Sequence, residues 1–271
     1  MCGHMRCAEE GDTVSRDREI LYTQLARDYC CTPAEIAQTR PVFTQFEKRA
    51  GRRHYLSAAD DYLKIACING KMLVTGEESV VAWCERRYRD TNAAWFMEYQ
   101  NLAELDARIR RDGFRIGQAH IFYVPDNRMP PSSSINGTLT WYRDEEIKRF
   151  RGDVRFCEAF AFCTDAPDRV GVSLTQEDRI VGMAGASEDS PLLWQVGVNV
   201  MPDVRGQGIG TLLVSLLSRQ LQSQGVLPFY GTAMSHIASQ RLALRAGFFP
   251  AWTELTTERI PTDRTPAGRG R

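Results

Sequence analysis

Residues 196–211, with the sequence VGVNVMPDVRGQGIGT, determine the predicted fold of the second half of the chain. Alternating valines predict a strand that ends at Pro202, because β-branched side chains favour strands and proline removes a backbone donor. The glycine-rich segment RGQGIG follows at residues 205–210, and helically spaced leucines come after it. A strand, a glycine-rich turn and a helix in this order direct several backbone N–H groups of a helix N-terminus at one point. Such a point favours an anion, so we predict a phosphate-binding turn.

Two common phosphate-binding patterns do not fit this turn. A Walker loop requires a Lys-Ser or Lys-Thr pair, and none follows Gly210. The dinucleotide-binding pattern is G-x-G-x-x-G, whereas the glycines here occupy positions 206, 208 and 210. A tight connection without any ligand stays an alternative, because a lone G-x-G is a weak signal.

The turn resembles the acyl-CoA pyrophosphate loop of the GNAT acetyltransferase superfamily, R/Q-x-x-G-x-G/A, which here is Arg205-x-x-Gly208-x-Gly210. Residues 236–248, HIASQRLALRAGF, are similar to the second signature of that family, an Asn-led helix that closes in Gly-Phe. The resemblance covers residues 131–260 and implies an α/β (α+β) fold with a mixed central sheet flanked by helices. The order of elements predicted there from pattern alone, β-α-α-β-β-β-α-β-α-β, is that of the GNAT fold.

The resemblance also implies that acetyl-CoA is the co-substrate. The backbone of residues 198–200 would pair with the pantetheine arm, and the N–H groups of residues 206–211 would hold the pyrophosphate. His236 and Ser239 would line the pantetheine and the thioester. The implied cofactor-binding residues are Val198, Val200, Arg205, Gly206, Gln207, Gly208, Ile209, Gly210, Thr211, His236 and Ser239. No metal site is predicted.

The residues that usually move protons in this family are missing. Many members carry an acidic residue on the central strand as general base, but residues 192–200, LLWQVGVNV, contain no ionisable side chain. Many also carry a tyrosine as general acid at the position of Ala243. The candidates for proton transfer are therefore His236 and Glu188, with the adjacent Asp189. The alternative for these two carboxylates is a solvated turn without a catalytic role. Tyr230, a water molecule or a group from the N-terminal half are further alternatives.

Two functions from different classes are therefore predicted. The first is an acetyl-CoA-dependent N-acetyltransferase, an acyltransferase that moves an acetyl group directly from CoA to a primary amine of a small molecule or a protein. The alternative is an acyl-CoA-binding module without turnover that acts as a sensor or an interaction protein. Both functions need the same phosphate cradle, so the loop does not separate them.

The composition excludes several classes of partner. Lys plus Arg and Asp plus Glu number 34 each in 271 residues, so no net charge attracts nucleic acid or an anionic membrane. No apolar run approaches the ~20 residues of a membrane span. Eight cysteines without C-x-x-C spacing, and an N-terminus without an apolar signal core, predict a cytoplasmic protein with mostly buried free thiols. A homodimer is compatible with these features.

The chain is predicted to divide at residues 127–137, NRMPPSSSING, which have the composition of a linker. Residues 1–130 would form a smaller N-terminal α/β domain of unknown role. Residues 131–260 would form the GNAT-type domain, and residues 261–271 a flexible tail. Within the GNAT-type domain, residues 156–163 are expected to be helical.

The N-terminal part carries local signals but no functional motif. Residues 1–12 are expected to be disordered. Asn69-Gly70, between the runs YLKIACI and KMLVT, predicts a β-hairpin. The basic and aromatic segment of residues 40–53 is expected to be a solvated helix face and loop.

Overall fold

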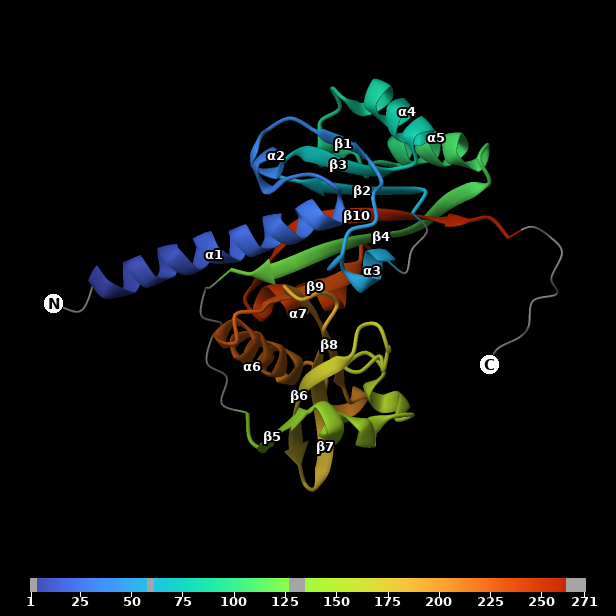
Figure 1. Ribbon diagram of the computed structural model, residues 1–271. Helices are drawn as coiled ribbons and strands as arrows, with labels where there is room; N and C mark the ends of the chain where they lie inside the picture. Colours follow the sequence, from blue (N-terminus) through green and yellow to red (C-terminus); the bar gives the residue numbers. More distant parts are fainter. Residues whose placement is uncertain (1–3, 58–60, 127–134, 262–271) are drawn as a thin grey trace.

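The computed structural model describes residues 4–57, 61–126 and 135–261, and Figure 1 shows how its elements are arranged. The α-helices are α1 (His4–Asp28), α2 (Pro33–Ala37), α3 (His54–Ser57), α4 (Glu78–Tyr88), α5 (Tyr99–Arg110), α6 (Ile209–Ser223) and α7 (Ile237–Arg245). The short 3-10 helices are η1 (Ala93–Trp95), η2 (Asp144–Phe150), η3 (Val154–Phe156) and η4 (Pro202–Val204). The strands are β1 (Val42–Gln45), β2 (Leu63–Ile68), β3 (Lys71–Gly76), β4 (Phe114–Pro125), β5 (Thr138–Arg143), β6 (Asp168–Gln176), β7 (Arg179–Ser187), β8 (Leu193–Val200), β9 (Leu227–Ala233) and β10 (Phe248–Arg259).

The strands of the described residues join into one mixed sheet. Its order is β1-β3-β2-β10-β4-β9-β8-β7-β6-β5. Two neighbouring pairs are parallel, β1 with β3 and β8 with β9, and the other pairs are antiparallel. The structure therefore confirms the α/β fold with a mixed sheet and flanking helices (Figure 1).

Strand β4 belongs to the first half of the chain but lies among the strands of the second half. It pairs with β10 along its length and with β9 over residues 120–123. The predicted boundary at residue 130 lies within residues 127–134, outside the described residues, and the sheet continues across it. The division into two domains stays a prediction, as does the tail, of which the structure describes residue 261 alone.

Helices cover both faces of the sheet. Adjacent residues of a strand point to opposite faces, and on β4 Phe122 packs in the core beneath α1 whereas Tyr123 packs in the core beneath α6 and α7. A further core lies where α4 and α5 cover the strands of the first half. Burial of these apolar faces holds the layers together.

The structure confirms the predicted hairpin of the N-terminal part and shows a capping box at the start of α2. Asn69 and Gly70 both have positive φ, 51° and 75°, as a two-residue turn between β2 and β3 requires. At the start of α2, Thr32 Oγ1 accepts a bond from Glu35 N–H, and the Glu35 carboxylate accepts one from Thr32 N–H.

Two predicted elements are wrong. Helix α1 begins at His4, so residues 4–12 are not disordered; Met, Arg, Ala and Glu in this stretch are good helix formers. Residues 156–163 do not form the predicted helix. The helical structure here is limited to the 3-10 turn Val154–Phe156. The chain beyond that turn instead lies flat on the sheet, where a Cβ on Gly185 would be 2.1 Å from the carbonyl oxygen of Ala159.

The basic segment of residues 40–53 is not a solvated helix face. It contains β1 and ends at Arg53, which is fully buried. Arg53 Nε donates to Asp28 Oδ2 at 2.6 Å, and a second guanidinium nitrogen donates to the Glu254 carboxylate. Two carboxylates therefore compensate the buried guanidinium, which also lies 5.3 Å from the centre of the Trp252 ring.

Candidate active site in the opening between β8 and β9

Strands β8 and β9 separate partway along their length. Their parallel pairing is limited to the register Leu193–Leu227, Trp194–Pro228 and Gln195–Phe229. Beyond it, β9 pairs with β4 on its other side, and β8 pairs with β7. The edge of β8 that faces β9 is thus left without a strand partner over residues 196–200, so its backbone groups are available to an extended ligand.

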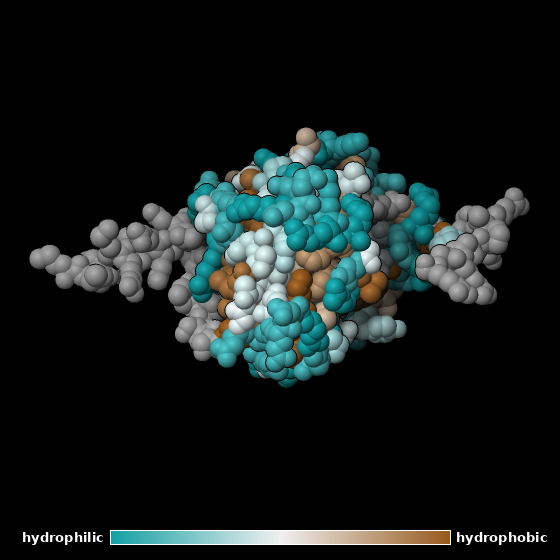
Figure 2. Space-filling view, turned by 90° about the horizontal axis from the view of Figure 1, so that it is seen from below, coloured by the Kyte–Doolittle hydropathy of each residue, from teal (hydrophilic) through white to brown (hydrophobic). Residues whose placement is uncertain are grey.

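A cavity of about 890 Å³ occupies this opening. Its wall includes residues 196–200 of β8, residues 230–233 of β9 and the beginnings of α6 and α7. Seen from the lower end of Figure 1, hydrophobic residues gather in the middle of the face between hydrophilic margins (Figure 2). A volume of this size is within the range of small-molecule and cofactor sites.

The N-terminus of α6 forms one end of the cavity. Gly206 and Gly208 both have φ of 84°, and Gly208 is the N-cap residue of α6. Glycine adopts this left-handed conformation without the steric cost of a side chain. Gly210 in the first turn allows close packing of α6 on α7, because a Cβ there would lie 2.6 Å from Leu242 Cδ1. The turn therefore brings the first N–H groups of α6 to the cavity without side chains in front of them.

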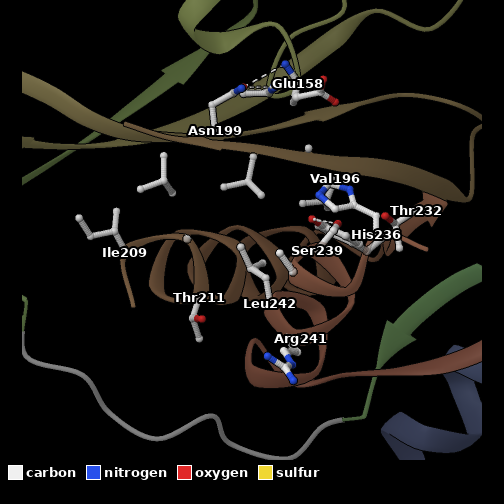
Figure 3. A pocket seen from close by; sticks show the side chains of 18 of the residues that line it. Glu158, Val196, Asn199, Ile209, Thr211, Thr232, His236, Ser239, Arg241 and Leu242 are labelled. Atoms are coloured by element: carbon white, nitrogen blue, oxygen red, sulfur yellow. Dashed lines mark hydrogen bonds between the residues drawn. The ribbon is translucent and has the colours of Figure 1, made fainter. Parts of the chain in front are cut away.

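Positive charge gathers at the same end. Arg205 lines the cavity, and its Nε donates to the carbonyl oxygen of Val200 at 3.1 Å, which closes the turn. Arg241 and Arg245, one helical turn apart on α7, also line the cavity. Figure 3 shows Arg241 on the helical side of the cavity together with Thr211. Guanidinium groups and helix N–H groups together suit a phosphate-bearing ligand.

The opposite face of β8 carries a polar loop. Asn199 Oδ1 accepts hydrogen bonds from the backbone N–H groups of Glu158, at 3.0 Å, and Ala159, at 2.8 Å. Figure 3 shows Asn199 and Glu158 across β8 from Ile209. Gly197 is required beneath this loop, because a Cβ would be 1.7 Å from the carbonyl oxygen of Glu158. The cavity thus has a helical side and a loop side, which meet where β8 and β9 separate.

A comparison with protein families identifies this arrangement. Residues 136–248 match the model of the acetyltransferase (GNAT) family. The match contains β8, the glycine turn and α6, and ends at the first residue of β10. Residues 136–248 form a GNAT domain. The match indicates an acyltransferase, and residues 4–57 and 61–126 form an α/β part that precedes the matched segment and shares its sheet.

Solved structures similar to this chain include other GNAT proteins. An acetyltransferase of the GNAT family from Colwellia psychrerythraea has 14% identity and a TM-score of 0.43, covering 73% of this chain and 81% of the other. A GCN5-related N-acetyltransferase from Kribbella flavida has 18% identity and a TM-score of 0.42, covering 59% and 64%. An aminoglycoside N-acetyltransferase in complex with CoA has 17% identity and a TM-score of 0.32, covering 48% and 100%. No curated protein sequence matches the chain.

Two features are absent from the part of the chain that the structure describes. No helix in it has the length and apolar character needed to cross a bilayer. No group of three or more His, Cys, Asp or Glu side chains within the described ranges could hold a metal ion.

The structure brings the predicted cofactor-binding residues of the GNAT domain to one cavity. All of them line it except Gln207, whose side chain is exposed beside the turn. Ser239 also forms a hydrogen bond with Tyr230, 2.9 Å between the two hydroxyl oxygens. Burial raises the pKa of Tyr230, so its phenol remains protonated at neutral pH.

The two predicted catalytic candidates are placed differently. His236 lines the cavity at the start of α7, and in Figure 3 its ring is directed toward Val196. Glu188 is not among the residues that line the cavity. Its carboxylate pairs with Arg169, with Oε2 2.7 Å from the nearer guanidinium nitrogen.

Asp189 is not part of a solvated turn. It is 4% exposed, and its Oδ1 accepts a bond from the backbone N–H of Tyr55 at 2.8 Å. Burial raises the pKa of Asp189 to about 6, although the nearby Arg53 guanidinium opposes the rise. Asp189 thus connects the GNAT domain to α3 of the N-terminal part.

Sequence reasoning missed a histidine in the cavity wall. His120 lies on β4, lines the cavity and is the register partner of Ala233 on β9. Its Nδ1 is 2.8 Å from the hydroxyl oxygen of Tyr55, and burial lowers its pKa from the usual value. No local pattern marks His120, because only the insertion of β4 beside β9 brings it to the site.

Proposed function

We propose that the protein transfers an acetyl group from acetyl-CoA to an amine in the opening between β8 and β9. The proposal rests on one observation. The same cavity contains the unpaired edge of β8 and the glycine turn at the N-terminus of α6. An extended amide-containing arm fits the strand edge, and a pyrophosphate fits the turn. CoA contains both groups.

The chain's own residues fit acetyl-CoA at each end of the cavity. The N–H groups of residues 206–211 would hold the pyrophosphate, and Arg241 and Arg245 would add positive charge. The backbone of residues 198–200 would pair with the pantetheine arm. Bound acetyl-CoA supplies the activated acyl group, while the protein binds it, orients it and excludes water.

The acceptor is assigned to the loop side of the cavity. Gln195, Glu158 and His120 line it, whereas the three arginines in the cavity wall belong to the turn and to α7. A cationic amine is favoured by this separation of charge. The acceptor class, whether a small-molecule amine or a protein amino group, stays a prediction, as do a cytoplasmic location and a homodimer.

The first prediction concerns the turn and uses two variants that differ only in charge. Gly206 has positive φ, and among the described residues only its own chain neighbours come within 4 Å of the place where a Cβ would lie. Asn and Asp tolerate this conformation better than most other side chains. Gly206→Asp places a carboxylate where the pyrophosphate would bind, whereas Gly206→Asn does not. We expect Gly206→Asp to bind CoA at least tenfold more weakly than Gly206→Asn, ~1.4 kcal/mol, in calorimetric titrations. Equal affinities in two variants of equal thermal stability would contradict the proposed turn.

Turnover separates transfer from binding alone. CoA release from acetyl-CoA is measured with a thiol reagent against a panel of polyamines, amino acids and N-terminal peptides. Release that depends on one class of amine would support transfer and identify the acceptor. Tight acetyl-CoA binding without amine-dependent release would favour the acyl-CoA-binding module.

A further inference from the structure

We propose that His120 is the general base that accepts the proton of the acceptor amine, and that Tyr55 and Gln118 position it. The inference rests on the proposed transfer reaction. It assigns a catalytic role to the part of the chain that precedes the GNAT domain, which begins at residue 136.

The backbone places His120 on the loop side of the cavity. On β4, His120 and Phe122 point to the same face of the sheet, because they are two residues apart. Phe122 belongs to the core beneath α1, on the face opposite α6 and α7. His120 thus lies on the side to which the acceptor is assigned, whereas the turn and the arginines lie on the other side.

The contacts of His120 accommodate a tautomer in which Nε2 carries the lone pair. The hydroxyl of Tyr55 donates to Gln118 Oε1 at 3.3 Å and lies 2.8 Å from Nδ1 of His120. A hydroxyl has one proton, so when Tyr55 donates to Gln118 its oxygen accepts a bond from Nδ1–H. Nε2 then carries the lone pair, and no described residue forms a hydrogen bond with it. A neutral imidazole in this tautomer is a base on a residue of the cavity wall.

The reaction balances without a further reactant. The amine nitrogen forms a bond to the carbonyl carbon, and the carbon–sulfur bond breaks with its electron pair on sulfur. The proton lost by nitrogen passes to Nε2 of His120 and then to solvent. The products are the amide and CoA.

The charged groups near His120 come from several elements. Tyr55 belongs to α3, and Glu254 is the register neighbour of His120 on β10. Glu254 is paired with Arg53, and Asp189 accepts the backbone N–H of Tyr55. Burial of His120 favours its neutral form, so the base is available at neutral pH.

The test compares His120→Asn, Tyr55→Phe and His236→Asn by kcat and KM between pH 5 and 9. We expect His120→Asn to lower kcat by roughly 10²- to 10⁴-fold with acetyl-CoA affinity unchanged by calorimetry. The fall in kcat as the pH drops through the imidazole pKa should disappear in this variant, because no imidazole remains at this position to be protonated. Tyr55→Phe should lower kcat less and move the acidic limb of the profile, which a purely structural role would not do.

Three outcomes decide the role of His120, and a fourth decides the transfer itself. Loss of kcat and of the acidic limb in His120→Asn, with native acetyl-CoA binding and thermal stability, supports the assignment. Wild-type kcat and pH profile in His120→Asn overturn it while leaving the proposed transfer intact. Loss of the acidic limb in His236→Asn instead would also overturn it, because His236 is the other histidine in the cavity wall. Acetyl-CoA binding without release by the wild type would overturn the transfer and the role of His120 with it.

Discussion

Single residues connect the N-terminal part to the GNAT domain through buried polar contacts. The main-chain oxygen of Asp189 accepts a bond from His54 N–H at 2.6 Å, and its carboxylate accepts one from Tyr55 N–H. The other carboxylate oxygen, Oδ2, is buried and has no hydrogen-bond partner among the described residues, which agrees with a raised pKa of this carboxyl group. Through Tyr55, Asp189 also supports the position of His120.

The residue-scale prediction follows from this raised pKa. A carboxyl with a native pKa of about 6 binds more protons in the folded than in the unfolded state between about pH 4 and 6. Its contribution to stability is therefore greatest at low pH and is lost as the pH rises, by roughly 2–3 kcal/mol in all. Asp189→Asn retains the acceptor for Tyr55 N–H and removes the titration. Urea unfolding at pH 4.5 and 7.5 should show the variant gaining stability relative to the wild type at the higher pH, whereas parallel changes would contradict the assignment.

The burial of Arg53 could not be predicted from the sequence. Its partner Asp28 is 25 positions away and Glu254 is 201 positions away. A basic segment without those partners is most often a solvated surface, and local pattern offers no sign of burial. Local pattern could predict that Arg205 and the three glycines of the turn lie together, because they are within a few residues of one another; their role stays a prediction.

Elements were predictable where local pattern and tertiary environment agree. Strand β8, the turn and α6 follow directly from alternation, glycines and helical spacing. Residues 156–163 were predicted as a helix because their apolar residues allow that period. Tertiary contacts override it: Phe160 packs in an aromatic core with Phe150, and its ring lies against Gly185.

The element-scale prediction tests that loop. Gly197→Ala introduces a Cβ that would lie 1.7 Å from the backbone oxygen of Glu158, so the loop must move away from β8. We expect the free energy of unfolding to fall by about 1–3 kcal/mol, as for other overpacked sites, and the KM of the amine to rise. Gly117→Ala on β4 is the control, since its Cβ would meet the exposed side chain of Glu258, at 3.3 Å. Equal stability and equal KM in both variants, measured by urea unfolding and CoA release, would contradict the prediction, because the loop could then move away from β8 without a cost.

At the scale of the whole molecule, the continuity of the sheet explains why the site needs both halves of the chain. β4 separates β9 from β10 and supplies His120 to the cavity wall. The linker composition of residues 127–137 suggested a boundary, but composition cannot show that a strand before the linker pairs with two strands after it. Such non-local pairing is set by the fold as a whole.

The last prediction is that residues 131–271 do not fold alone. Without β4, the edge of β9 over residues 230–233 and the whole of β10 lose their partner, and the apolar side chains of Phe122 and Trp252 lose each other. Exposed strand edges of this kind lead to aggregation. We therefore expect the fragment to show no cooperative thermal transition and no acetyl-CoA binding. Co-expression of residues 1–130 with residues 131–271 should restore both, because the cut lies between paired strands and removes none of them. A soluble fragment 131–271 that unfolds cooperatively and binds acetyl-CoA would instead establish an independent GNAT domain, with β4 as an addition to its sheet.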